Sequence, residues 1–318
     1  MNYEPVSHTM TDRPLVRLPS GRDVSVAVHR YDGGDGPVVY VQAAQHGIEL
    51  NGPAALRRLH GSLSSASVAG TVVVVPVVNP LALDHRSYMT PAEYDAIHPN
   101  LNRVWPGDPH GTLQERLAAN VWAIASEADA MIDLHTGTPE TLPHVRHVAG
   151  REAARELAEA FGTEFILTDT RPETEAESTK TSIRKAAAGV GIPALTAELS
   201  NSRQISIDSV QSGVDGVRNV LRALSVLEER PAPPPTQTVL ERGGGSVTVG
   251  ESGLFEPQPD VSVGGTITAG ESLGSVHSPS TFERLETVTA PDDGVVYSLT
   301  DGGIVIAGER VAGIGTRA

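Results

Sequence analysis

The sequence predicts an α/β fold: a mostly parallel sheet with helices on both faces, followed by a small C-terminal all-β domain. Through the first 230 residues, apolar β-branched runs alternate with segments of helical periodicity, the pattern of a sheet covered on both faces. After residue 237 the helical periodicity disappears, and short Val, Ile and Thr runs alternate with Gly, Asp and Pro turns. The Pro-rich segment 231–237 is typical of a stiff linker, so we expect domains over 1–230 and 238–318.

The first elements of the chain follow from local patterns. Alternation of polar and apolar residues predicts a strand over 23–29, and a Gly/Asp-rich turn over 33–36 follows it. The apolar, β-branched run 38–41 indicates a buried strand, and 53–63 has the pattern of a helix. The next buried strand is 71–78, with the sequence TVVVVPVV.

The rest of the first domain repeats this alternation. Residues 113–128 place apolar side chains on one side of a helix, and the apolar run 130–134 indicates a third buried strand. The remaining predicted elements are helices over 152–161, 183–188 and 214–227, and strands over 165–168 and 193–199.

Length and composition exclude several classes of protein. The 318 residues, 39% of them apolar, are enough to bury a full core. No stretch approaches the 18 or so uncharged apolar residues of a membrane span, and residues 1–20 are charged and lack the apolar core of a secretory signal. We therefore expect a cytoplasmic protein. The absence of cysteine removes thiolates as nucleophiles or metal ligands.

The net charge of the chain indicates which classes of partner it can bind. A net charge of −15 argues against nucleic acid as a ligand, because phosphate contacts need clustered Lys and Arg. The composition is therefore that of a protein with neither nucleic acid nor membrane as a partner. It is compatible with a homo-oligomer and does not determine the oligomeric state.

Two motifs at the ends of predicted strands carry possible metal ligands. The motif QHGIE places His46 and Glu49 three residues apart in the turn after the strand 38–41, and DLHTG places His135 at the end of the strand 130–134. The carboxyl ends of parallel strands meet at one edge of a sheet, where ligands bind. Two imidazoles, one carboxylate and a water in the fourth position form the hydrolytic zinc arrangement. An isolated His-x-x-Glu is more often an ion pair or a helix cap; the joint placement after buried strands favours the metal.

Two neighbouring motifs leave alternatives open. His144 and His147 also have ligand-like spacing, but no predicted strand precedes them. Asp133 lies two residues before His135, so both point to one side of a strand. Asp133 is either a structural residue or the acceptor that fixes the tautomer of a ligating imidazole.

Polar residues in two loops are candidates for substrate binding. Asn102 and Arg103 lie side by side and could grip a carboxylate, the arginine in a bidentate manner. Arg86 follows the strand 71–78 and could stabilise the negative charge that develops on a carbonyl oxygen. For any single arginine, a solvated surface charge is the commoner explanation.

Glu198 interrupts the apolar strand 193–199. A buried charge costs free energy unless it is paired or functional. At the carboxyl end of a strand near the metal, Glu198 would act as a general base and then pass the proton to the leaving amine. The alternative is a glutamate on an edge strand that faces solvent.

Together these pieces resemble the succinylglutamate desuccinylase/aspartoacylase family, a branch of the zinc carboxypeptidase-like fold. The resemblance spans nearly the whole chain. It rests on five segments in the family's order: QHGIE, VNP with Arg86, NLNRVWPG, DLHTG and GIPALTAELS. The tail also resembles the family's β-domain in GLFEP and APDDGVV.

The resemblance implies one Zn²⁺ per chain, held by His46, Glu49 and His135. It implies Glu198 as the catalytic base and Arg86 at the oxyanion. It further implies that Asn102 and Arg103 bind the substrate carboxylate. The implied reaction is hydrolysis of a small N-acyl amino acid, as in the family's N-acetyl-diaminobutyrate deacetylases. We expect the C-terminal domain to cover the cleft and to admit only small substrates.

Two other functions compete with deacylation. A zinc carboxypeptidase acting on peptides would use the same metal ligands. A non-catalytic binding protein that kept the fold would lack a metal ligand or the base, and the sequence has both. The acyl group and the amino acid of the substrate do not follow from the sequence.

Overall fold

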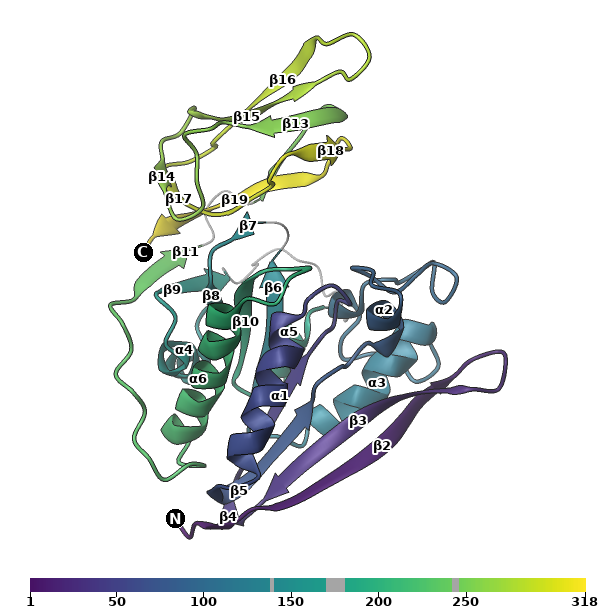
Figure 1. Cartoon of the computed structure of the whole chain (residues 1–318), viewed down its shortest axis with the longest axis vertical. Coiled ribbons are helices and arrows are strands. Elements are labelled where there is room, and N and C mark those ends of the chain that lie inside the picture. The colour runs from purple at the N-terminus through teal and green to yellow at the C-terminus, as the bar shows by residue number, and fades with distance from the viewer. Residues whose placement is uncertain (138–139, 170–180, 242–245) are drawn as a thin grey trace.

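The structure is a computed structural model that describes residues 1–137, 140–169, 181–241 and 246–318. One large sheet runs through the molecule, and a smaller antiparallel sheet lies at one end of it (Figure 1). The strand order of the large sheet is β14-β17-β19-β11-β9-β8-β10-β6-β4-β5-β3-β2. This agrees with the predicted mostly parallel sheet and all-β C-terminal region.

The elements up to residue 230 alternate much as the sequence predicts. The strands are β1 (Glu4–Pro5), β2 (Ser7–Arg17), β3 (Asp23–Asp32), β4 (Gly34–Ala43), β5 (Ser67–Val75), β6 (Ala130–Gly137), β7 (Glu140–Thr141), β8 (His144–Val148), β9 (Phe165–Asp169) and β10 (Ala194–Asn201). The helices are α1 (Asn51–Leu63), α2 (Pro80–Asp84), the 3₁₀ turn η1 (Leu101–Arg103), α3 (Leu113–Ala125), α4 (Glu152–Phe161), α5 (Ile183–Gly189) and α6 (Ile207–Ala223).

The centre of the sheet is parallel. Strands β5, β4, β6 and β10 run in one direction, and their register places Ala197 beside Leu134. On one side, β8 pairs antiparallel with β10 and continues in parallel to β9 and β11. On the other side, β3 and β2 are antiparallel. The carboxyl ends of β4, β6 and β10 therefore meet at one edge.

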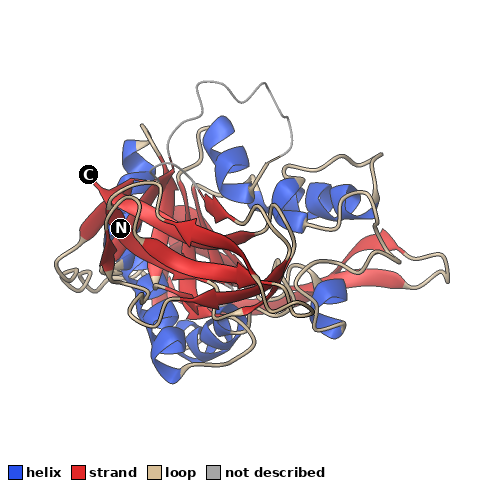
Figure 2. Cartoon of the chain, turned by 90° about the horizontal axis from the view of Figure 1, so that it is seen from above, coloured by secondary structure: helices blue, strands red, loops and turns tan. Residues whose placement is uncertain are grey.

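Helices cover both faces of the sheet (Figure 2). Leu59 of α1, Leu157 of α4 and Val217 of α6 share one buried cluster with the sheet residue Ile132. Leu117 and Val121 of α3 and Ile183 of α5 belong to a second cluster. The two clusters make the two sides of a three-layer core. None of the described helices is long and apolar enough to cross a membrane.

Several predicted boundaries are wrong. The turn expected over 33–36 is shorter, because β4 already begins at Gly34 and pairs there with Ala69. Strand β2 was not predicted because its side chains are mostly exposed and lack an apolar face. The last helix of this region begins at the Ser206 cap, whose hydroxyl accepts from the Ser209 amide, and ends at Ala223.

The C-terminal region is tied to the large sheet by backbone pairing. Its strands are β11 (Thr238–Glu241), β12 (Ser246–Thr248), β13 (Gly253–Pro257), β14 (Thr266–Ile267), β15 (Ser272–His277), β16 (Arg284–Thr289), β17 (Gly294–Leu299), β18 (Gly303–Val305) and β19 (Arg310–Arg317). Strand β11 pairs with β9 in parallel and with β19 in antiparallel fashion. Strands β16-β15-β13-β18 form the smaller sheet, over a separate buried cluster that includes Phe255 and Val276.

Candidate active site

The site lies where the carboxyl ends of β4, β6 and β10 meet. His46 and Glu49 are in the loop between β4 and α1, and His135 is in β6. Glu198 of β10 is directly beside His135 in the parallel register. The His46–Glu49 loop packs closely, since a Cβ on Gly47 would lie 2.0 Å from the Ala82 carbonyl oxygen. Glycine is therefore needed at position 47 for this turn.

His46, Glu49 and His135 form one buried group. Their ligating atoms lie within 4.8 Å of one another. Nδ1 of His46 is 2.8 Å from Glu49 Oε1, and Nδ1 of His135 is 2.8 Å from Glu49 Oε2. Each side chain is at most 4% exposed. The structure thus brings together the three residues that the sequence singled out as metal ligands.

The Nε2 atoms of His46 and His135, which are not the nitrogens nearest Glu49, contact other polar side chains. Nε2 of His135 is 2.8 Å from Asp133 Oδ2, and Nε2 of His46 is 3.2 Å from Asn100 Oδ1. Carboxylate and amide oxygens accept, so in the tautomer that protonates Nε2 both Nε2 atoms donate to these oxygens and both Nδ1 atoms are available to bind a metal ion. Asp133 therefore occupies the tautomer-fixing position considered from the sequence.

Asp133 is itself held in place. Gln42 and Gln45 donate to its two oxygens at 3.0 and 2.8 Å. Trp105 in turn donates to the Gln45 side-chain oxygen at 2.8 Å. This buried hydrogen-bond network fixes the orientation of the His135 ring through its Nε2 atom, on the side away from Glu49.

The three residues fit a metal ion. When Nε2 of each ring carries the proton, both Nδ1 lone pairs point at the Glu49 carboxylate, so a cation placed between them would be bound by all three groups. Glu49 Oε2 is buried and makes no hydrogen bond of good geometry. Two imidazoles and a carboxylate are the donor set of hydrolytic zinc sites.

The charges around His46, Glu49 and His135 also favour a bound cation. Burial raises the pKa of Glu49, but His46 and His135 outweigh it and lower the pKa to about 2. Burial lowers the pKa of His135, but the Asp133 and Glu49 carboxylates outweigh it and raise the pKa well above its usual value. Glu49 is therefore anionic at neutral pH.

A cavity of about 590 Å³ opens over this group. Its wall is rich in charged and polar side chains, among them Tyr88, Asn102, Arg103, His144, Arg146, Asp169, Arg184, Lys185, Glu198, Tyr297 and Arg310. The size suits a small molecule.

Glu198 stands at the cavity beside the metal-ligand group. Its Oε2 atom is buried and has no hydrogen-bond partner. Burial raises the pKa of Glu198, against the opposing effect of His135. A carboxylate with a raised pKa and an unengaged oxygen is suited to accept and return a proton.

Asn102 and Arg103 also line the cavity. Nδ2 of Asn102 is 3.4 Å from His135 Nε2, and its Oδ1 is buried without a partner. Arg103 is exposed and donates to the Asn102 carbonyl oxygen at 2.6 Å. Both residues therefore reach the space where a substrate would lie next to His135.

Arg86 is the predicted site residue that the structure does not bring to the cavity. Its side chain is exposed, its φ is +51°, and it is not part of the cavity wall. Two residues later, Tyr88 does reach the site, where its ring stacks on His46 with centroids 4.1 Å apart. Burial raises the pKa of Tyr88 above its usual value. The sequence offered no signal that distinguished Tyr88.

The alternative metal pair His144 and His147 lies on strand β8, which was expected to be a loop. Side chains three residues apart on a strand point to opposite faces. His144 lines the cavity, whereas His147 bonds to Thr168. Burial, with help from Arg146, lowers the pKa of His144 to about 3, so its imidazole is neutral.

The structure adds a buried ion-pair group to the wall of the cavity. Arg146 Nη2 donates to Asp169 Oδ1 at 2.6 Å, and Arg184 pairs with the other oxygen of Asp169. Burial raises the pKa of Asp169, but Arg184 and Arg146 outweigh it and hold the pKa well below its usual range. One carboxylate facing two guanidinium groups leaves an excess positive charge. Arg171, another arginine that could grip the substrate carboxylate in place of Arg103, lies outside the described residues.

The C-terminal strands contribute the remaining wall. Tyr297 of β17 and Arg310 of β19 line the cavity, and the Arg310 guanidinium lies 5.4 Å from the Tyr297 ring centre. Tyr297 also packs edge-on against His144, with ring centres 5.6 Å apart. The sequence around Tyr297 matches no clear motif, so the sequence alone does not predict its place in the cavity wall.

Comparison with known proteins identifies the family. The catalytic-domain model of the succinylglutamate desuccinylase/aspartoacylase family matches residues 35–224. A relative, the N-alpha-acetyl-L-2,4-diaminobutyric acid deacetylase of Halomonas elongata, is 30% identical over 167 residues. That match spans 48% of this chain and 48% of the relative, so it covers about half of each protein.

Solved structures resemble the whole chain. A succinylglutamate desuccinylase/aspartoacylase from Rhodobacter sphaeroides is 25% identical, with a TM-score of 0.83 over 99% of this chain and 97% of its own. The product-bound ectoine utilization protein EutE (DoeB) from Ruegeria pomeroyi is also 25% identical, with a TM-score of 0.83 over 99% of this chain and 96% of its own. Because the family model matches more than half of the chain, this protein belongs to the succinylglutamate desuccinylase/aspartoacylase family.

Proposed function

We propose that this protein is a zinc-dependent amidohydrolase that cleaves the amide bond of a small N-acyl amino acid, with one catalytic Zn²⁺ per chain. The observation that carries the proposal is the buried group of His46, Glu49 and His135 at the floor of a small-molecule-sized cavity that also contains Glu198. The names of the relatives, a deacetylase and a desuccinylase/aspartoacylase, support the reaction class.

His46, Glu49 and His135 would hold the zinc ion through two Nδ1 atoms and a carboxylate. When bound, zinc lowers the pKa of water to about 7 and polarises a carbonyl group. Asp133 and Asn100 keep both rings in the tautomer that presents Nδ1 to the metal.

Glu198 would move the protons. Its raised pKa makes it a better base than an ordinary carboxylate, and the burial that raises the pKa keeps bulk water from competing. Glu198 takes a proton from the attacking water and returns it to the nitrogen of the leaving amino acid. His144 remains neutral beside it and would not compete for that proton.

Asn102 and Arg103 would bind the carboxylate of the substrate. Both lie at the cavity wall, Asn102 closer to His135. The excess positive charge of the Arg146–Asp169–Arg184 group adds to the attraction for an anionic substrate. The supporting observation is electrostatic: cationic side chains surround the cavity of a chain with a net charge of −15.

Arg86 remains the oxyanion residue that the family resemblance implies. In the structure its side chain is exposed, so this role requires a different conformation of the loop after α2. The decisive experiment is the kcat of Arg86→Ala. A fall of about 10²–10³-fold, typical of a lost oxyanion donor, supports the role; an unchanged kcat removes Arg86 from the reaction.

Domain organisation belongs to the same proposal: a catalytic domain over 1–230, a linker over 231–237 and a β-domain over 238–318. The β-domain would restrict the cavity to small substrates, because Tyr297 and Arg310 form part of its wall.

The test is a panel of N-acetyl and N-succinyl amino acids, dipeptides and longer peptides, assayed for amine release with and without a chelator. We expect turnover of N-acyl amino acids that the chelator abolishes and added zinc restores. Preferential cleavage of peptides would indicate a carboxypeptidase instead. No turnover by protein whose His46, Glu49 and His135 hold zinc would indicate a binding protein.

A further inference from the structure

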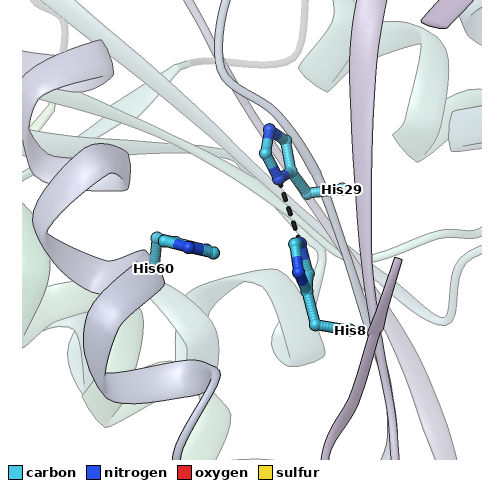
Figure 3. A group of neighbouring side chains, drawn as sticks. All are labelled: His8, His29 and His60. Atoms are coloured by element: carbon cyan, nitrogen blue, oxygen red, sulfur yellow. Dashed lines mark hydrogen bonds between the residues drawn. The ribbon is translucent and has the colours of Figure 1, made fainter. Parts of the chain in front are cut away.

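Three histidines outside the cavity meet near the far end of α1. His8 is on β2, His29 on β3 and His60 near the end of α1 (Figure 3). One ring nitrogen from each lies within 4.8 Å of the others. Helix α1 starts just after Glu49, and nine residues of helix, about 14 Å, separate Asn51 from His60. The group is therefore distinct from the metal ligands in the cavity.

Strand register explains why the three rings meet. His8 is directly opposite Tyr31 in the β2–β3 pairing, and His29 lies two residues before Tyr31, so all three side chains share one face. Helix α1 covers this face, since Tyr31 shares a buried cluster with Leu59. His60, next to Leu59, lies at the rim of that contact and is exposed.

The distances match those between ligands of one ion. His8 Nε2 and His29 Nδ1 are 3.1 Å apart. Two nitrogens that bind a tetrahedral zinc ion at about 2.0–2.1 Å are separated by about 3.3 Å. The rings of His8 and His60 meet edge-on, with centroids 4.9 Å apart, which lets the third imidazole approach from the side.

His60 is oriented as ligating histidines commonly are. Its Nδ1 pairs with the buried Tyr31 hydroxyl at 2.8 Å, so Nε2 is the ring nitrogen left to bind a ligand. A hydrogen bond from the second nitrogen fixes the ring and its tautomer at most histidine–metal sites.

We propose that His8, His29 and His60 form a second, accessory binding site for a divalent transition-metal ion such as Zn²⁺. The group contains three imidazoles and no carboxylate, which favours zinc, copper or nickel over calcium or magnesium. His8 and His29 are half-buried and His60 is exposed, so an ion reaches the site from solvent and keeps a water ligand. Its effect would be to tie the β2–β3 hairpin to α1.

The experiment separates the two sites by counting bound zinc. Full-length protein is stripped with a chelator, dialysed against zinc and analysed by mass spectrometry for metal content. Wild type should hold two zinc ions per chain and His60→Ala one. The His46→Ala/His135→Ala variant should also hold one, and adding His60→Ala to it should remove that ion. His110→Ala, which removes an exposed histidine outside both groups, is the matched control.

Two outcomes would overturn the proposal: a single zinc ion in wild type that His60→Ala does not change, or two ions in both proteins. The position of His60 on the surface of a helix makes alanine a safe substitution for folding. As a second readout, zinc should raise the melting temperature of the His46→Ala/His135→Ala variant, and His60→Ala should cancel this rise. Deacylase activity should be unchanged in His60→Ala, so the outcome for this site is independent of that for the cavity.

Discussion

Two glutamates beside His135 differ in chemistry because their neighbours differ. Glu49 touches both histidines, which lower its pKa to about 2, whereas Glu198 has a raised pKa because burial dominates. Groups whose surroundings push their pKa values apart take different roles in a reaction. Glu49 is thus suited to hold a cation and Glu198 to exchange a proton.

Glu198→Gln should reduce kcat by about 10²–10⁴-fold, because the amide cannot accept a proton from water. Zinc content should stay at the wild-type value, since Glu198 is not one of the grouped ligands. In wild type, kcat/KM should fall as the pH drops through the raised pKa of Glu198, since the base must be deprotonated. Substantial activity in Glu198→Gln, at unchanged zinc content, would contradict the assignment.

Asp133→Asn should weaken zinc binding about 10–100-fold, the usual effect of losing the carboxylate behind a ligating histidine. The reason is that Asp133 accepts from His135 Nε2 and fixes the tautomer. Competition with a chromophoric chelator measures the affinity. Asp129→Asn, which removes an exposed carboxylate that accepts from the Val38 amide, is a control for the general loss of charge. Equal affinities in all three proteins would show that Asp133 is only structural.

Arg103→Ala should raise KM for carboxylate-bearing substrates with little change in kcat, because a contact made equally in the ground and transition states affects binding alone. Its guanidinium lies at the cavity wall and donates to the Asn102 carbonyl oxygen. Comparing a substrate with its carboxamide isolates the effect. An unchanged KM would mean that another cavity arginine, such as Arg146, binds the carboxylate.

At the level of elements, the Arg146–Asp169–Arg184 group links β8, β9 and α5. Asp169 is 5% exposed, so its charge is compensated by the two arginines rather than by water. The group fixes the positions of three elements at the cavity wall, and both arginines line the cavity.

Asp169→Asn should destabilise the fold by about 3–5 kcal/mol, because it leaves the buried Arg184 and the half-buried Arg146 without their counter-charge. Urea denaturation at neutral pH measures the difference from wild type. The native pKa of Asp169 is lowered, so its contribution is full above the unfolded value of about 3.9 and is lost as the pH falls below it. The two proteins should therefore converge in stability at acidic pH. A constant gap down to low pH would argue against the ion pairs.

At the scale of the whole molecule, the C-terminal region is part of the large sheet and of the cavity wall. Strand β11 pairs with β9, and Leu240 of β11 packs with Leu167, Val295 and Tyr297 in a small buried cluster. Tyr297 belongs both to this cluster and to the cavity wall. The position of Tyr297 at the site therefore depends on the contact between the two regions.

Leu240→Ala should cost about 2–5 kcal/mol of unfolding free energy, as for other buried leucines, because it opens a cavity at this junction. Val239→Ala is the matched control, since Val239 is 37% exposed and adjacent in the strand. If Tyr297 shapes the site, the leucine variant should also have altered KM values. Equal stability of the two variants would show that the junction contributes little.

Local pattern alone was enough to predict the alternating architecture, the three grouped residues His46, Glu49 and His135, and the position of Glu198 beside them. The physical reason is that buried parallel strands are apolar and short, and their carboxyl ends converge on one edge whatever the details of packing. Polar residues that follow such strands must then come together.

Only the tertiary structure decided which more distant side chains join them. Tyr88 rather than Arg86 faces the cavity, Tyr297 arrives from the C-terminal strands, and His144 separates from His147 because β8 is a strand. The His8–His29–His60 group likewise depends on the β2–β3 register and on the rotation of α1. Such contacts join residues far apart in the chain, and their geometry depends on strand register and helix packing, which no local pattern encodes.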